Sequence, residues 1–200
     1  PIQKRSEIYA DRVEVVEQRY PAAGDPNAIV QLGVVAPRGG KPRWLDLGAN
    51  PDIYLARVDW ADGQRVAFQV ESRDQRRLDL IEADLRSGRQ RTLLSETSKT
   101  FINLHDNLDF LDNGDFLWSS ERSGFQHLYL YDRDGKLKRQ LTDGDWMMEK
   151  LQEVDEAKGI AYFTATRESP LERHLYSVPL AGGQVTKLST AQGMHEFVFS

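Results

Sequence analysis

The chain has 200 residues, of which 40% are hydrophobic and 28% are charged, and its formal net charge at pH 7 is -5. This composition is typical of a soluble globular domain, and the negative charge disfavours nucleic acid as a partner. The sequence has no cysteine, which excludes disulfides, thiolate metal sites and a thiol nucleophile. No apolar run reaches the roughly 18 residues of a membrane span. Because the first residues are charged, we expect any export signal to precede Pro1.

The first 27 residues do not share the pattern of the rest of the chain. A short alternation of apolar and polar residues over residues 6–18 includes Val13 and Val15, and residues 20–24 then break it. Such an alternation predicts extended structure. Two interpretations stay open for this segment: an arm inserted in a larger unit, and an ordinary strand followed by a loop.

From residue 28 onward, one hairpin outline recurs four times. An apolar strand, a glycine turn and a second strand occupy residues 28–48, and the outline returns around Gly88, Gly135 and Gly182. The last two copies begin at His127 and His174 and align without gaps, 47 residues apart. A period of about 40 to 50 residues indicates stacked or radial repeats.

A second hairpin precedes three of these copies. Its turns lie within residues 59–63, 109–114 and 155–159, and a strand rich in aromatic or β-branched residues follows each turn. Glycine at such turns accepts the positive φ that tight hairpins need. Two successive hairpins make a four-stranded antiparallel sheet, which is one propeller blade. We therefore predict an all-β fold, a partial β-propeller of about three and a half blades with an N-terminal extended arm.

The predicted boundaries follow the repeat. Residues 1–27 form the extended arm inserted in a blade, and residues 28–50 form the outer half of that blade. Three blades follow at 51–98, 99–145 and 146–191, and residues 192–200 form the first strand of the next blade. Such a set cannot close a ring and would leave strand edges free, so we expect the chain to be part of a longer protein.

The sequence has no signature of an active site of its own. It lacks G-x-S-x-G, which places a nucleophilic serine on a sharp turn, and it lacks the phosphate loop GxxxxGK[ST]. The serines of WSSERSGFQHLYLYD lie close to His127, but their surroundings are typical of a connector between hairpins. The pair His195 and Glu196 lacks the second histidine of a metal motif, because position 199 is Phe199. We predict no catalytic residue, no metal ligand and no cofactor in the chain.

The remaining histidines and the tryptophans receive mainly structural interpretations. His127 and His174 recur at the same point of two blades, which favours a role in the strands. His105 does not recur, and it lies in a connection that can reach the channel of a propeller, so a structural and a functional role both stay open. The four tryptophans stand at strand positions or strand ends, and we predict core packing for them: Trp44, Trp60, Trp118 and Trp146.

Residues 101–146, FINLHDNLDFLDNGDFLWSSERSGFQHLYLYDRDGKLKRQLTDGDW, resemble the propeller of the dipeptidyl peptidase IV branch of the prolyl oligopeptidase family. Residues 17–35, EQRYPAAGDPNAIVQLGVV, are similar to that family's stretch of Tyr-Pro, a small residue, Gly and Asn before an outer strand. With YLARVDW and RHLYSVPL, the resemblance covers nearly the whole chain. TolB-like propellers share LYLYD and a glycine turn, so the order and combination of the motifs carry the specificity.

The resemblance implies the N-terminal propeller of a bacterial serine exopeptidase that removes Xaa-Pro or Xaa-Ala dipeptides from peptide N-termini. Its triad would lie in a C-terminal α/β-hydrolase domain of the same chain, while an eight-bladed propeller gates access and positions the peptide. The family's pair of amine-binding glutamates has no counterpart here. Phe101 and Asn103 match the connection that walls the peptide beyond the scissile dipeptide. The arm would pair two subunits into a homodimer, and the location would be periplasmic or secreted.

A TolB-like propeller that acts as a protein-binding scaffold is the alternative. It predicts blades that continue without an inserted arm, and no hydrolase domain after the propeller. A self-contained hydrolase is disfavoured by the missing nucleophile motif and the incomplete blades.

Overall fold

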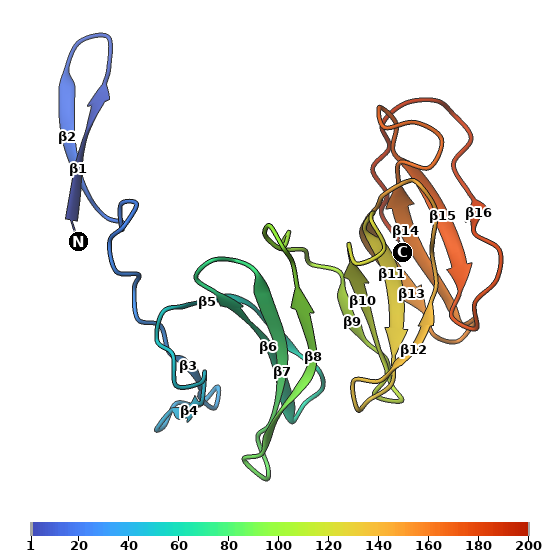
Figure 1. Ribbon diagram of the computed structural model, residues 1–200, viewed down its shortest axis with the longest axis horizontal. Helices are drawn as coiled ribbons and strands as arrows, with labels where there is room; N and C mark the ends of the chain where they lie inside the picture. Colours follow the sequence, from blue (N-terminus) through green and yellow to red (C-terminus); the bar gives the residue numbers. More distant parts are fainter. Residues whose placement is uncertain (1, 200) are drawn as a thin grey trace.

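The computed structural model describes residues 2–199, and every regular element in this part of the chain is a β-strand. The strands form five antiparallel sheets, three of them four-stranded, arranged side by side along the chain (Figure 1). The predicted all-β partial propeller with an N-terminal arm is therefore confirmed.

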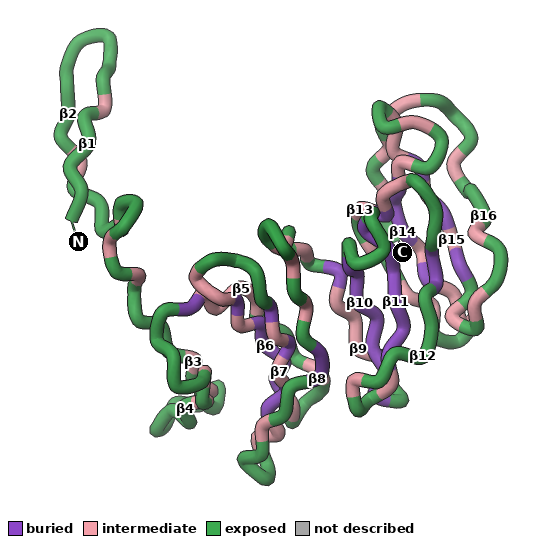
Figure 2. The backbone as a smooth tube through the Cα atoms, in the orientation of Figure 1, coloured by how far each residue is buried: buried purple, intermediate pink, exposed green. Residues whose placement is uncertain are grey.

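Strands β1 (Ile2–Ile8) and β2 (Val13–Arg19) form a hairpin that projects away from the other sheets (Figure 1). The pairing runs without interruption from Ile2 opposite Arg19 to Ile8 opposite Val13. The alternation over residues 6–18 thus spans a turn and is two strand segments, not one strand. Nearly all of the hairpin is exposed (Figure 2).

Strands β3 (Leu32–Val34) and β4 (Arg43–Leu45) form a small sheet beside the first four-stranded sheet. Its connection to that sheet is polar, because Gln90 donates to the carbonyl of Asp46 at 2.8 Å and accepts from the Asp46 N–H at 2.9 Å. Within the hairpin, the Trp44 ring covers Gly33 so closely that a Cβ there would lie 2.8 Å from the ring. Glycine at this position leaves room for the ring against the strand.

Three four-stranded sheets follow, each with its strands in sequence order. Their bounds are β5 (Ile53–Trp60), β6 (Arg65–Ser72), β7 (Arg77–Asp84) and β8 (Gln90–Thr97); β9 (Leu108–Phe110), β10 (Phe116–Ser120), β11 (His127–Tyr131) and β12 (Leu137–Gln140); β13 (Met148–Asp155), β14 (Ile160–Ala165), β15 (His174–Pro179) and β16 (Thr186–Lys187). Each sheet is a meander of two hairpins, as the repeat predicts.

Apolar side chains fill the spaces between neighbouring sheets. All five residues of β10 are buried, and successive side chains point to opposite faces of a strand. Phe116 and Trp118 pack with Leu80 of the β5–β8 sheet, whereas Leu117 packs with Phe163 of the β13–β16 sheet. Figure 2 shows these inner strands as buried segments. The middle sheet is thus held through both faces by the hydrophobic effect.

Polar groups add specific ties between the sheets. The buried amide of Asn107 donates to the carbonyl of Glu149 at 3.1 Å and accepts from the Leu151 N–H at 2.8 Å. Gln126 donates to the carbonyl of Met148 at 2.8 Å, and the Met148 N–H donates back to the Gln126 carbonyl. These bonds fix the register between the β9–β12 and β13–β16 sheets.

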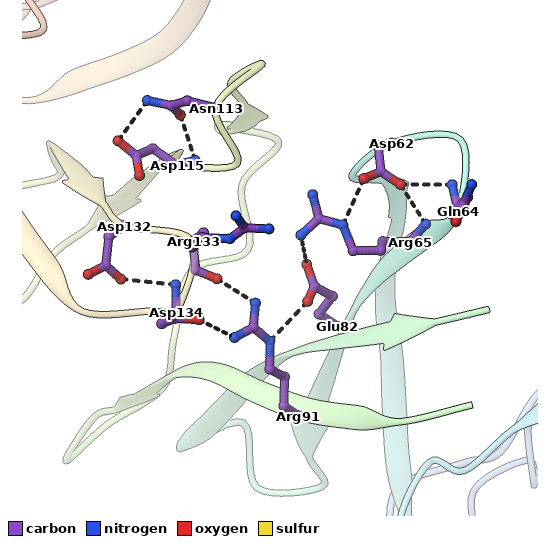
Figure 3. A network of polar contacts seen from close by, with 10 residues as sticks. All are labelled: Asp62, Gln64, Arg65, Glu82, Arg91, Asn113, Asp115, Asp132, Arg133 and Asp134. Carbon is purple, nitrogen blue, oxygen red and sulfur yellow. Dashed lines mark hydrogen bonds and ion pairs between the residues drawn. The ribbon is translucent and has the colours of Figure 1, made fainter. Parts of the chain in front are cut away.

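A charged network joins the β5–β8 and β9–β12 sheets near the turn ends of β7 and β11 (Figure 3). Glu82 is almost fully buried and lies 2.9 Å from both Arg65 and Arg91. Arg91 also bonds to Asp134 and to the carbonyl of Arg133 in the next sheet. One buried carboxylate therefore organises two arginines, and one of these crosses to the neighbouring blade.

The repeated histidines have the same structural role in two sheets. His127 Nδ1 lies 3.1 Å from Thr142 Oγ1, and His174 Nδ1 lies 3.0 Å from Ser189 Oγ. Both rings are buried, and the two hydroxyls also accept the N–H of the residue after each histidine. The prediction of a role in the strands is confirmed.

The tryptophans divide into two groups. Trp118 is fully buried, and Trp146 stacks near Phe163 with ring centroids 6.2 Å apart. Trp44 and Trp60 are each 59% exposed, so the prediction of core packing is wrong for these two. Trp44 belongs to the two-stranded β3–β4 sheet, and Trp60 ends β5, the edge strand of the β5–β8 sheet.

Candidate functional site

Phe101 and Asn103 lie in the connection from β8 to β9, at the end of the sheets opposite the charged network (Figure 1). The backbone of this connection is held by the β6–β7 turn, because the Ile102 N–H donates to the Gln75 carbonyl at 2.8 Å. Gln75 has a φ of 58°, an unusual value for a residue other than glycine. The Phe101 side chain stays 55% exposed, so the connection presents an aromatic ring to solvent.

A hollow of about 100 Å³ opens beside this ring. Its walls come from the end of β8, from the β8–β9 connection, and from β10 with the loop that follows it. Phe101, Asn103 and His105 all line it, together with Trp118 and Glu121. The structure therefore brings together the three residues for which the sequence suggests a functional role, Phe101, Asn103 and His105.

The interior of the hollow holds a compensated ion pair. The Glu96 carboxylate accepts hydrogen bonds from Trp118 Nε1 at 3.1 Å and from Ser120 Oγ at 3.0 Å. Arg122 pairs with the same carboxylate, and its guanidinium lies 4.7 Å from the ring centroid of Tyr129. These two charges are therefore neutralised within the protein.

The side chain of Asn103 hydrogen-bonds within the protein, whereas a residue that contacts a peptide would offer its amide to the substrate. Its Nδ2 donates to both carboxylate oxygens of Glu121 at 3.0 Å. The amide therefore holds a carboxylate across the mouth of the hollow, between the β8–β9 connection and the β10–β11 loop.

His105 packs into the wall and is neutral at physiological pH. Its ring meets Trp118 edge-on with centroids 4.5 Å apart, and its Nδ1 accepts the N–H of Asn107. Burial lowers the pKa of His105 to about 4, and the Ser119 backbone offsets only part of this effect. The proton of the neutral ring therefore lies on Nε2. These contacts favour the structural role, although the ring still borders the hollow.

The serines at 119–123 form no nucleophilic pair with His127. Both ring nitrogens of His127 are engaged within its own blade, by Thr142 and by the Gly144 carbonyl. Ser119 Oγ accepts the amide of Asn107 at 3.1 Å. A general base must reach the hydroxyl that it activates, and no histidine hydrogen-bonds to the hydroxyl of any of these serines within residues 2–199. Ser120 donates to Glu96, but that carboxylate is already paired with Arg122.

The described part of the chain also bears on metal binding and on membrane spans. No group of three His, Cys, Asp or Glu side chains converges there as metal ligands do. No helix in residues 2–199 is long and apolar enough to cross a membrane.

Sequence reasoning missed Glu96, Glu121 and Arg122, which line the hollow with Phe101. Glu96 lies in β8, and the other two lie in the loop after β10. No spacing links these positions, because the hollow forms only when the neighbouring sheets pack. In the segment 119–126, charged residues border the site as well as serines.

Comparisons with known proteins show which family has this architecture. The family model described as "Dipeptidyl peptidase IV (DPP IV) N-terminal region" matches residues 1–200. The chain is 29% identical over 185 residues to a probable dipeptidyl peptidase 4 of Aspergillus fumigatus, which covers 86% of the chain and 24% of the relative. It is 30% identical to a probable dipeptidyl-aminopeptidase B of Emericella nidulans, covering 94% and 23% respectively. The chain thus spans about a quarter of these relatives.

A solved structure agrees with the sequence comparison. The crystal structure of Porphyromonas gingivalis dipeptidyl peptidase 4 superposes with a TM-score of 0.89 and 29% identity, covering 100% of the chain and 29% of that protein. The match includes the projecting hairpin as well as the blades, since it covers the whole chain. The chain therefore belongs to the dipeptidyl peptidase IV N-terminal region family.

Proposed function

We propose that the chain is the propeller part of a serine exopeptidase that removes Xaa-Pro or Xaa-Ala dipeptides from peptide N-termini. The observation that carries the proposal is the match of the family model over residues 1–200, and the similarity to dipeptidyl peptidases along the chain supports it. The catalytic triad would come from a C-terminal α/β-hydrolase domain of the same chain. The location that fits this activity is periplasmic or secreted.

In this proposal the propeller gates access and positions the substrate. A ring of rigid blades admits flexible peptides and excludes folded proteins, because a folded chain is too wide for the channel. The packed sheets and the ties at Asn107 and Gln126 support the rigidity that such a gate needs. The propeller then contributes to catalysis by presenting one end of the peptide to the hydrolase domain.

Phe101 and Asn103 remain the proposed substrate-binding residues, Phe101 by direct contact and Asn103 through Glu121. The exposed ring of Phe101 can pack against an apolar portion of the peptide at low entropic cost. Asn103 acts differently from a direct hydrogen-bonding contact, because its amide holds Glu121 at the mouth of the hollow. Its contribution is to place that carboxylate beside the peptide.

The hairpin β1–β2 would pair two subunits into a homodimer. Ile8, Val13 and Val15 lie on one face of the hairpin and are 81%, 61% and 65% exposed. An apolar face of this kind with free strand edges favours association with an identical hairpin. Light scattering on a chain that extends to the length of the relatives tests this, with Val15→Glu as the variant expected to give monomers.

The activity is tested with a Gly-Pro chromogenic amide. The 200-residue chain and a chain extended to the length of the relatives are assayed in parallel. We expect release of the chromophore only by the extended chain, where a hydrolase domain is present. Activity in neither would favour a TolB-like binding scaffold, and activity in the 200-residue chain would contradict the proposal.

A further inference from the structure

Glu121 is a charged group at the mouth of the hollow that no cation neutralises within residues 2–199. Its two oxygens accept hydrogen bonds from the neutral amide of Asn103 at 3.0 Å, and the side chain is exposed to solvent. The amide orients the carboxylate without cancelling its charge. The carboxylate is therefore held in a fixed position with its charge available to a ligand.

The other charges of the hollow do not cancel this one. Glu96 and Arg122 neutralise each other, with side-chain exposures of 13% and 35%. His105 carries no charge at physiological pH, because burial lowers its pKa to about 4. Lys99 lies two residues before Phe101 but does not line the hollow. The site as a whole is therefore anionic by about one charge.

The aromatic ring of Phe101 adds an apolar surface beside the carboxylate of Glu121. It is 55% exposed and lines the same hollow as Glu121. A lysine or arginine side chain has an apolar stem and a cationic head, so it can cover an aromatic ring while its charge meets a carboxylate. An acidic side chain in the same place would face like charge, and a purely apolar one would gain only the contact with the ring.

We propose that Glu121 is a specificity-determining residue, which makes the hollow favour peptides with a lysine or arginine side chain lying against Phe101. This inference rests on the proposed peptidase function. It assigns a preference to the exposed mouth of the hollow and leaves the chemistry of bond cleavage to the hydrolase domain.

The test uses the extended chain and a set of hexapeptides with proline at the second position. A single lysine is moved through the other five positions, with norleucine as its neutral counterpart, and dipeptide release is followed by mass spectrometry. We expect lysine to raise kcat/KM over norleucine at one position by roughly two- to fivefold, as for an exposed ion pair. The preference should shrink in high salt, because salt screens exposed charges.

The variant Glu121→Gln should reduce that lysine preference to near one, and Glu121→Lys should transfer it to glutamate at the same position. Asp143→Asn is the control, since Asp143 is an exposed acid in the connection from β12 to β13 and does not line the hollow. Unfolding midpoints of all variants verify folding.

The outcomes separate the two proposals. A lysine preference that is absent from every position, or that persists unchanged in Glu121→Gln, would overturn the role of Glu121. Equal loss of kcat/KM for lysine and norleucine peptides would also overturn it, because that pattern indicates a general structural role. Failure of the extended chain to release any dipeptide would instead refute the proposed peptidase function.

Discussion

Arg91 of β8 and Asp134 of the β11–β12 turn form an ion pair between neighbouring blades, with Nη1 2.6 Å from Oδ1 (Figure 3). The same guanidinium bonds to Glu82, whose side chain is 6% exposed, whereas the side chain of Asp134 is 72% exposed. One arginine thus has a buried partner and a solvated partner, and these two bonds should differ greatly in their contribution to stability.

Replacing the buried partner should be much more costly than replacing the solvated one. We expect Glu82→Ala to lower the free energy of unfolding by about 3 kcal/mol, because it leaves Arg65 and Arg91 without their shared carboxylate. Asp134→Ala should cost less than about 1 kcal/mol, as is usual for a solvated pair. Urea unfolding of the chain measures both, and equal losses would contradict this assignment.

A glycine in the β11–β12 turn should be irreplaceable for a steric reason. Gly135 has a φ of +82°, and a Cβ there would lie 1.9 Å from the carbonyl oxygen of Leu93 in the next blade. Gly159 has a φ of +66° and no atom within 4 Å of such a Cβ, so it is the matched control. We expect Gly159→Ala to cost about 1 kcal/mol, from the backbone alone.

Gly135→Ala should cost about 3 kcal/mol or more, since the clash is added to the backbone term. Thermal unfolding of the two variants side by side checks this prediction. Indistinguishable midpoints would show that the blades do not approach each other this closely.

Asp109 should make the chain less stable as the pH rises from about 4 to about 6. Burial first, and then the charges of Glu153 and Glu156, raise the pKa of Asp109 to about 6. A carboxyl with a raised pKa binds its proton more tightly in the folded state, so stability falls between the unfolded and the folded pKa.

Asp109→Asn should remove this slope and stabilise the chain at pH 7 by about 1 kcal/mol, a value reduced because the group is only partly buried. Urea unfolding midpoints at pH 4.5 and pH 7 provide the measurement. If the variant and the parent lose stability in parallel over this interval, Asp109 is not the responsible group.

The buried carboxylate of Glu71 lowers the stability of the folded chain when it is charged. Its side chain is buried, and neither carboxylate oxygen has a hydrogen-bond partner; the same holds for Oε1 of Gln69, two residues earlier on β6. Burial raises the pKa of Glu71. An unsatisfied buried charge of this kind is destabilising.

We expect Glu71→Gln to raise the free energy of unfolding at pH 8 by about 1 kcal/mol, because the new amide is uncharged and can donate to Gln69. The gain should disappear toward pH 4, where Glu71 itself is protonated. Chemical unfolding at both pH values distinguishes this from a simple packing effect, which would be independent of pH. A variant less stable than the parent at pH 8 would refute the prediction.

The sequence by itself determined the strands of each blade, because the contacts that define a blade are local. Glycine turns, alternating apolar residues and the paired positions of His127 and Thr142 all fall within one repeat. Such neighbours must meet whenever the hairpin forms, so their spacing can be read directly. The resemblance of the ordered motifs to a family also depends only on this local information.

The tertiary structure alone decided how the repeats differ. The spacing between His127 and Thr142 recurs at His174 and Ser189, but in the β5–β8 sheet the partner of Ser95 is Asp79, 16 residues earlier. The register of β7 against β8 differs by one residue from that of β11 against β12, which the fixed period cannot show.

The candidate site is also determined by contacts between segments that are distant in the sequence. Asn103 meets Glu121, and Arg91 meets Asp134, only because separate chain segments pack side by side. Which charge is neutralised and which stays free depends on that packing and on the exclusion of water, and a linear pattern carries neither. The sequence therefore determined the blades, and the contacts between segments decided the chemistry of the hollow that they enclose.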